Sequence, residues 1–293
     1  MLSNYKYVSM ARPGGQSEEA ILLNCEIQKQ INITAFYSIF YEKLMPDYNY
    51  PGEIHDFWDI VLVLSGNIGV TAGSNVFILE EGQCILHRPM EFHSLWSAKG
   101  TSPEIVLFTF EADILTLPEK FIFSTTKNIQ QTLLNLALES EKIFEKDYIH
   151  VKSVKKDRLF EAQRLTNNLE LVLISLFHYM QNDITSSITE SGEKYSAIVQ
   201  CMEKNIEKNI SIEELAELCG MSCSGLKKTF KKYAGIGAGQ YFNNMKMIRA
   251  AESIKEGKSV SEAALEVGFT DPNYFSTAFK RICGYSPSQL KKN

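Results

Sequence analysis

Polar side chains near the C-terminal end are spaced so that they share one face of a predicted helix. The stretch EVGFTDPNYFSTAFKRICGYSP, residues 266–287, starts a helix at Asp271-Pro272 and continues with apolar residues at helical spacing. The face left over carries Asn273, Ser276, Thr277 and Lys280. Small polar residues and one cation on an exposed face suit either plain solvation or hydrogen bonding to a polar or anionic partner.

The six cysteines show no metal-binding pattern. The sequence has no CxxC pair, and although Cys219 and Cys223 are four apart, no second pair completes a zinc site. We therefore interpret all six as thiols of a protein in a reducing compartment.

Charge is distributed unevenly along the 293 residues, a length that suits two domains. The net charge is −5, yet residues 193–293 carry 15 Lys and Arg against 11 Asp and Glu. A basic end on an acidic protein points to a polyanionic partner, although solvated helices are often rich in lysine. The longest apolar run, LELVLISLFHYM, is about half of a membrane span. No basic-then-apolar leader opens the sequence, so we expect a soluble cytoplasmic protein.

Residues 1–125 are predicted to form strands. Short segments rich in β-branched and aromatic residues, such as FWDIVLVL, IGVTA and EIVLFTF, alternate with turns that contain Gly, Asn or Ser. Strands of this length and spacing predict an antiparallel β-barrel or sandwich.

Residues 126–183 change to helical spacing. One helix in this segment has apolar residues at steps of three and four, an a/d seam that either packs on the barrel or pairs with another helix. The seam consists of Ala162, Leu165, Leu169, Val172, Leu176 and Tyr179. The polar residues 184–193 are expected to form a linker.

Residues 194–293 are predicted to be helical and to contain one unit twice. Each copy has a capped short helix, a glycine-centred turn and a capped longer helix, which is the helix-turn-helix pattern. Ser211 with Glu214 and Ser259 with Glu262 form the two capping boxes, which are structural and not catalytic. The predicted fold class is thus α+β multidomain: an antiparallel barrel, a helical segment and an all-α double helix-turn-helix domain.

The second unit resembles the signature of the AraC/XylS family of transcriptional regulators. The matching residues are Ala264, Gly268, Phe269, Asp271, Tyr274, Phe275, Phe279, Lys280, Gly284, Ser286 and Pro287. The first unit matches through Leu215, Ala216, Gly220, Met221, Ser222, Leu226, Phe230, Lys231 and Gly235. Over residues 30–180, HDFWDIVLVLSGN and LEEGQCILHRPMEFHS look like the cupin-type sensor domain that often precedes this module. Lys246 stands where the family usually has Arg.

The resemblance implies sequence-specific binding of double-stranded DNA, with two recognition helices in adjacent major grooves. The implied base-facing residues are Ser224, Gly225, Lys227 and Lys228 in the first helix and Asn273, Tyr274, Ser276 and Thr277 in the second. The expected phosphate contacts are Lys231, Lys232, Lys246, Lys280 and Arg281. RNA polymerase is a further partner of such regulators.

The cupin resemblance leaves the ligand of the sensor domain open. Metal-binding cupins supply several His and a carboxylate, whereas here His55, Asp59 and His93 fall one His short of that set. We therefore expect no bound metal and no cofactor. A small polar organic ligand fits better, and its candidate contacts are His55, Trp58, Arg88, His93 and Trp96.

The leading hypothesis is a ligand-responsive transcription factor that is not an enzyme. The resemblance and the apolar seam together predict a homodimer, with Leu165, Leu169, Val172 and Leu176 at its interface. Two alternatives stay open: a metal-dependent cupin enzyme with a helical appendage, and a regulator controlled by a partner protein.

Overall fold

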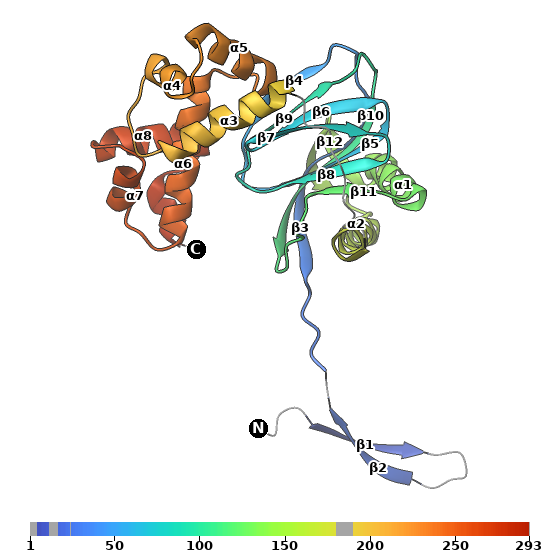
Figure 1. Ribbon diagram of the computed structural model, residues 1–293. Helices are drawn as coiled ribbons and strands as arrows, with labels where there is room; N and C mark the ends of the chain where they lie inside the picture. Colours follow the sequence, from blue (N-terminus) through green and yellow to red (C-terminus); the bar gives the residue numbers. More distant parts are fainter. Residues whose placement is uncertain (1–4, 12–16, 24, 180–189, 293) are drawn as a thin grey trace.

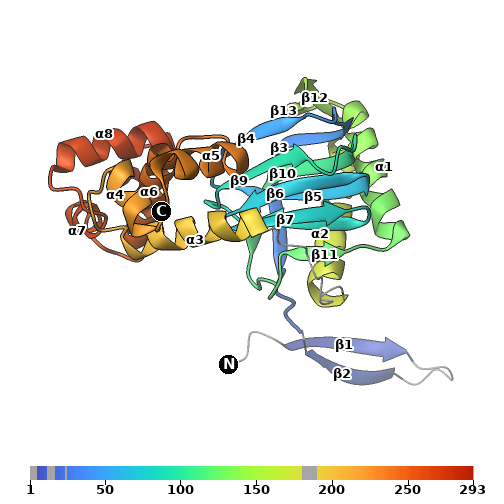
Figure 2. The same cartoon turned by 45° about the horizontal axis from the view of Figure 1, so that its top comes forward.

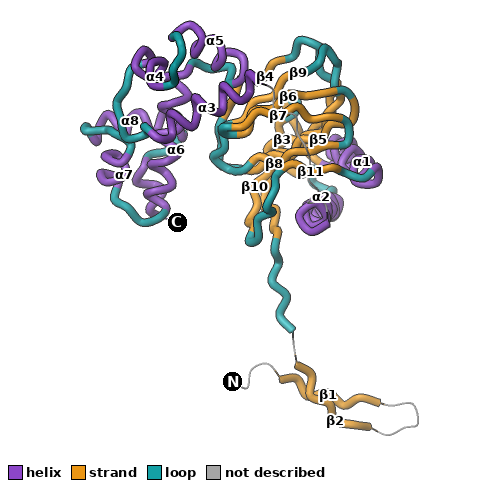
Figure 3. Tube along the Cα trace, in the orientation of Figure 1, coloured by secondary structure: helices purple, strands orange, loops and turns teal. Residues whose placement is uncertain are grey.

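The molecule consists of a strand-rich half and a helical half. The structure is a computed structural model that describes residues 5–11, 17–23, 25–179 and 190–292. Figure 3 shows most strands gathered on one side and most helices on the other. We refer to residues 25–179 as the strand-rich half and to residues 190–292 as the helical half. Among the described helices, none is long and apolar enough to cross a lipid bilayer.

The strand-rich half is built from two antiparallel sheets. The seven-stranded sheet has the order β11-β8-β5-β10-β3-β13-β12, and the four-stranded sheet has the order β4-β9-β6-β7. Their strands are β3 (Ile31–Lys43), β4 (Asn49–Glu53), β5 (Trp58–Ser65), β6 (Asn67–Ala72), β7 (Asn75–Glu80), β8 (Gln83–His87), β9 (His93–Ser97), β10 (Glu104–Ile114), β11 (Ile122–Ser124), β12 (Phe144–Asp147) and β13 (His150–Val154). A separate hairpin of β1 (Tyr5–Ala11) and β2 (Ser17–Leu23) stands away from both sheets (Figure 1).

Aliphatic side chains fill the space between the two sheets. Val63 of β5, Val70 of β6 and Leu79 of β7 are fully buried in one cluster, because alternate residues of each strand face inward. The predicted antiparallel, cupin-like architecture is confirmed, and its strands are hydrogen-bonded as two facing sheets.

Two helices cover the outer face of the seven-stranded sheet (Figures 1 and 2). These are α1 (Lys127–Ile143), which Thr126 caps, and α2 (Leu159–Tyr179). In the sequence, the β12–β13 hairpin lies between α1 and α2. Residues 126–183 were expected to be entirely helical, and this hairpin departs from that expectation. In the expected linker, residues 184–189 lie outside the described residues, and residues 190–193 already belong to α3 (Glu190–Lys204).

The apolar seam of α2 packs on its own chain. Leu165, Leu169 and Leu176 are fully buried, and Val172 is 5% exposed, in a cluster that includes Phe108 of β10. The prediction that these four residues form an interface between two chains is therefore wrong, because the sheet and α1 already cover them. The outward side of α2 carries Leu171 and Ile174 instead, and the side chain of Tyr179 lies outside the described residues.

The helical half contains the predicted unit twice. The first pairs α4 (Ile212–Leu218) with α5 (Cys223–Tyr233), the second pairs α7 (Val260–Glu266) with α8 (Pro272–Cys283), and α6 (Ala238–Lys255) joins them. The last element is η1 (Pro287–Lys292). Both predicted capping boxes are present with both of their hydrogen bonds, and the Asp271 carboxylate accepts from the backbone of Asn273.

The two halves share an apolar contact. Helix α3 packs on β7, and Figure 2 shows it bridging the sheet and the other helices. Val76 and Phe92 from the four-stranded sheet belong to the same buried cluster as Tyr195, Phe230 and Tyr241 of the helical half. The positions of α5 and α6 are thus tied to the strand-rich half by core packing.

Candidate functional site

Helix α5 presents a polar, basic face. Leu226, Phe230 and Tyr233 point into the core of the helical half, since all three are buried. Ser224, Lys227, Lys228, Lys231 and Lys232 are exposed, and Gly225 is half-buried. The Ser222 hydroxyl accepts from the backbone N–H of Gly225 and caps the helix.

Helix α8 presents a corresponding face with fewer charges. Phe275, Ala278 and Phe279 are buried, whereas Asn273, Tyr274, Thr277, Lys280 and Arg281 are exposed. The hydroxyls of Ser276 and Thr277 donate to backbone carbonyls one turn earlier, those of Pro272 and Asn273. The Thr277 hydroxyl proton is therefore already engaged within the helix.

Lys246 does not fit its expected role as a phosphate contact. It is 4% exposed, and its ammonium group donates to the carbonyl oxygens of Ile206, Lys208 and Val267 at 2.7–2.8 Å. Burial lowers its pKa to about 8. All three N–H donors bond within the protein, so Lys246 holds the turn of the second unit against the loop that follows α3.

The five residues predicted to bind an organic ligand do not line one site. Trp58 is buried in the cluster beneath α1 and α2. Trp96 lies on the opposite side, 5.7 Å between ring centroids from Tyr233 of the helical half. Arg88 is exposed and forms an ion pair with Glu91 at 3.1 Å. Only His55 and His93 come together.

His55 and His93 meet two carboxylates. Asp59 Oδ2 lies 3.1 Å from His55 Nε2 and 3.0 Å from His93 Nε2, and Glu53 of β4 completes the group. Burial opposes ionisation of Asp59, but the two imidazoles outweigh it and hold the pKa of this carboxyl below its usual range. Burial likewise disfavours a charge on His93, yet Asp59 and Glu53 outweigh it and raise its pKa to about 10. Sequence reasoning missed Glu53 because β4 was not predicted as a strand.

Hydrogen bonds from the four-stranded sheet reach the end of α5. The Thr71 and Ser94 hydroxyls both donate to the carbonyl oxygen of Tyr233, and the Gly52 N–H donates to that of Ala234. Sequence patterns gave no signal for these contacts, because they join residues far apart in the chain.

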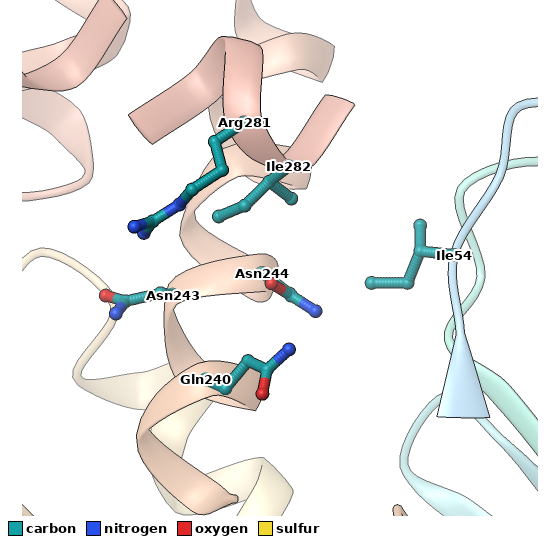
Figure 4. A pocket seen from close by; sticks show the side chains of 6 residues that line it. All are labelled: Ile54, Gln240, Asn243, Asn244, Arg281 and Ile282. Carbon is teal, nitrogen blue, oxygen red and sulfur yellow. The ribbon is translucent and has the colours of Figure 1, made fainter. Parts of the chain in front are cut away.

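A cavity of about 620 Å³ lies between the two halves. Figure 4 shows Gln240, Asn243 and Asn244 along α6, with Arg281 from α8 above them and Ile54 of the strand-rich half facing them across the cavity. Amide and guanidinium groups on one side therefore face an apolar side chain on the other.

Comparisons with known proteins found family matches in both halves of the chain. The family described as an AraC-like ligand binding domain matches residues 36–132, and that described as a helix-turn-helix domain matches residues 215–293. The HTH-type transcriptional regulator YbfI of Bacillus subtilis is 22% identical over 225 residues, which cover 77% of this chain and 81% of that one. The HTH-type transcriptional activator RhaS of Salmonella schwarzengrund is 21% identical over 261 residues, with coverage of 86% and 91%. Among solved structures, ToxT of Vibrio cholerae is 16% identical, with a TM-score of 0.37 and coverage of 90% and 97%.

The two matched regions cover most of the two facing sheets and nearly all of the tandem helix-turn-helix units. The order of the regions is that of a sensor followed by a DNA-binding module. This chain therefore belongs to the AraC family and is a DNA-binding transcriptional regulator with an N-terminal ligand-binding domain.

Proposed function

We propose that one chain binds two successive major-groove segments of DNA, one with α5 and the other with α8. The observation that carries this proposal is the exposure of a polar face on each of two similar helices joined by one helix. Helix α6 has 18 residues and is therefore about 27 Å long at 1.5 Å per residue. Together with the width of the flanking units, this suits major grooves that recur every ~34 Å on one face of the duplex.

The side chains of this surface fall into two groups, those suited to base contacts and those suited to phosphate contacts. Asn273 can pair with adenine through two hydrogen bonds, and Lys227 or Lys228 can reach guanine O6 and N7. Lys231, Lys280 and Arg281 bind phosphates and supply affinity without sequence choice. Since its target is DNA, the protein works in the compartment that holds the DNA, and we assign it no catalytic step.

A small molecule that binds the strand-rich half is the proposed effector. A cavity of about 300 Å³ beside β7 and β8 is lined by Phe77, Leu86, Arg88, Glu91 and Phe121, among others. The Arg88 guanidinium lies 5.0 Å from the centre of the Phe121 ring. An apolar molecule with one polar end fits this combination. Binding of this molecule would change the affinity for DNA by linkage, through the contact between the strand-rich half and the helical half.

The outward face of α2 is the proposed dimer contact. Leu171 and Ile174 are 60% and 44% exposed, on the side of the helix that the sheet does not cover. A second copy related by a two-fold axis would cover both and present two DNA-binding modules.

Two substitutions on α8 test the DNA surface. Asn273→Ala should change sequence preference by about 1–3 kcal/mol at one base position, because a base contact is lost. Lys280→Ala should weaken binding to all sequences alike and lower the salt slope by roughly one unit. Competition binding with wild-type and single-base variants of a selected DNA site measures both. Unchanged discrimination by Asn273→Ala would show that α8 does not read bases.

A further inference from the structure

Four potential metal ligands converge at one edge of the strand-rich half. Glu53 ends β4, His55 follows it, Asp59 lies in β5 and His93 begins β9. One ligand atom from each of the four lies within 4.8 Å of the others. Besides the two contacts of Asp59, Glu53 Oε1 lies 3.6 Å from His93 Nε2 and 4.0 Å from His55 Nε2.

Both imidazoles are oriented as metal ligands are. His55 Nδ1 lies 3.1 Å from the carbonyl oxygen of Phe57, and His93 Nδ1 lies 3.0 Å from that of Glu91. A carbonyl only accepts, so each Nδ1 carries a proton. In the neutral ring, Nε2 then directs its lone pair toward the carboxylates, and this carbonyl contact is the usual outer-shell partner of a metal-bound histidine. His87 stacks on His93 with ring centroids 4.7 Å apart and further restrains its ring.

The cluster also contains one buried carboxylate oxygen without a hydrogen bond. The side chains of Asp59 and His93 are 5% and 6% exposed. Within the described residues, Asp59 Oδ2 faces the Nε2 atoms of His55 and His93, whereas Asp59 Oδ1 is buried and has no hydrogen-bond partner. Buried polar atoms of native proteins are normally paired, so this oxygen points to a ligand that the four side chains hold in common.

We propose that Glu53, His55, Asp59 and His93 bind one divalent first-row transition metal ion. Two imidazole nitrogens and two carboxylate oxygens are donors that Zn²⁺ and Fe²⁺ accept, whereas Ca²⁺ and Mg²⁺ prefer oxygen ligands alone. Ligands bound at roughly 2.0–2.2 Å lie about 3–4 Å from one another around a single ion. The distances of 3.0–4.0 Å among these atoms therefore require only small side-chain movements.

The site lies beside the contact between the two halves. Gly52, the residue before Glu53, donates its N–H to the carbonyl oxygen of Ala234 at 3.0 Å, directly after α5. Ile54, the residue after Glu53, lines the cavity that α6 and α8 also line. A metal bound by Glu53 would fix the end of β4 and, with it, this contact. This consequence rests on the proposed function, whereas metal binding itself does not.

Metal titration of the full-length chain tests the site directly. After removal of metals by chelation and dialysis, Zn²⁺ binding is measured in competition with a chromophoric chelator, and Co²⁺ serves as a spectroscopic probe. The wild type should bind one ion per chain, with visible Co²⁺ absorption of a site with nitrogen and oxygen ligands. His55→Asn should abolish stoichiometric binding. Glu53→Gln should weaken it at least about tenfold, since even outer-shell partners contribute 10–100-fold.

Asp56→Asn is the matched control. Asp56 is an exposed carboxylate in the same segment, next to His55 and outside the cluster, so its loss should leave Zn²⁺ binding unchanged. Glu53 is 43% exposed, and Glu53→Gln should therefore fold even if His55→Asn does not, as circular dichroism would verify. The proposal is overturned if the wild type binds less than about one-tenth of an ion per chain, or if Glu53→Gln and folded His55→Asn bind like the wild type.

A DNA-binding measurement distinguishes metal binding itself from its proposed effect on DNA affinity. The DNA affinity of the wild type should differ severalfold between a solution with Zn²⁺ and one with chelator. The DNA affinity of Glu53→Gln should be the same in both. One bound ion with unchanged DNA affinity would overturn the coupling and leave the site standing. A chain that binds the ion but no DNA would overturn the proposed function and not the metal site.

Discussion

The hydroxyl of Thr71 donates a hydrogen bond to the carbonyl oxygen of Tyr233 over 2.5 Å, although the two residues are 162 positions apart in the chain. Ser94 donates to the same oxygen at 2.8 Å. Tyr233 ends the first recognition helix, so the four-stranded sheet holds the end of an element that we assign to DNA. In the proposed function, this contact is the route by which a ligand bound to the strand-rich half would act on α5.

Removal of both hydroxyls should loosen this end of α5. In Thr71→Val with Ser94→Ala, the buried carbonyl loses both side-chain partners, at a cost of about 1–3 kcal/mol. Hydrogen exchange of the full chain should therefore become faster for the last turn of α5 and stay unchanged in α8. Thr71→Ser keeps the hydroxyl and should resemble the wild type. Equal exchange in all three proteins would mean that the contact does not hold the helix.

Lys246 should matter for stability and not for DNA affinity. Lys246→Met leaves three carbonyl oxygens, one of them buried, without their common donor and should lower the free energy of unfolding by about 2–4 kcal/mol. At a temperature where it stays folded, its salt slope for DNA binding should equal that of the wild type. Lys231→Met should show the opposite pattern, a stable protein with a salt slope reduced by roughly one unit. A reduced salt slope in Lys246→Met would mean that Lys246 contacts DNA phosphates after all.

The turn glycines of the two units should respond differently to substitution. Gly220 and Gly268 both have positive φ, at 66° and 82°, which L residues adopt with strain. A Cβ on Gly220 meets nothing within 4 Å, whereas one on Gly268 would clash with the backbone oxygen of Glu207. Gly220→Ala should therefore cost about 1–2 kcal/mol and Gly268→Ala more than about 3 kcal/mol. Urea denaturation measures both, and equal losses would contradict the packing at Gly268.

Substitutions on the two sides of α2 should have different effects, one on dimer formation and the other on folding. Leu171→Glu adds a charge to an exposed position and should yield a folded monomer, because an unpaired charge in the proposed dimer contact is costly. Leu169→Glu adds the same charge to a fully buried position of the domain core and should prevent folding. Sedimentation velocity with far-UV circular dichroism distinguishes them. A folded Leu171→Glu dimer, or a wild type that is monomeric at micromolar concentration, would exclude this contact.

Local patterns predicted the helical half well. The capping boxes at Ser211 and Ser259 and the Asp271 cap depend on residues three positions apart or closer, and these are features that sequence alone displays. Exposure of Asn273 and Lys227 followed from the same helical periodicity. The antiparallel sheets were recognisable because their strands are short, apolar and separated by turns.

The errors at the candidate sites and at the α2 seam concern contacts between distant segments. Lys246 occupies a helix face that is polar in sequence, but carbonyls from residues 206–208 and Val267 surround it in the fold. The α2 seam had the spacing of a pairing helix, and its own sheet turned out to cover it. Glu53 lies in β4, an irregular five-residue edge strand that contains Pro51 and Gly52, and no apolar alternation marks it.

Selection of binding sites from random duplex DNA tests the central claim most directly. If α5 and α8 read successive major-groove segments, sites selected by the wild type should contain two conserved blocks whose centres lie about 10 base pairs, one helical turn, apart. Sites selected by Asn273→Ala should lose conservation in one block only, and those selected by Lys228→Ala in the other. A single conserved block, or two variants that relax the same block, would contradict the two-helix account.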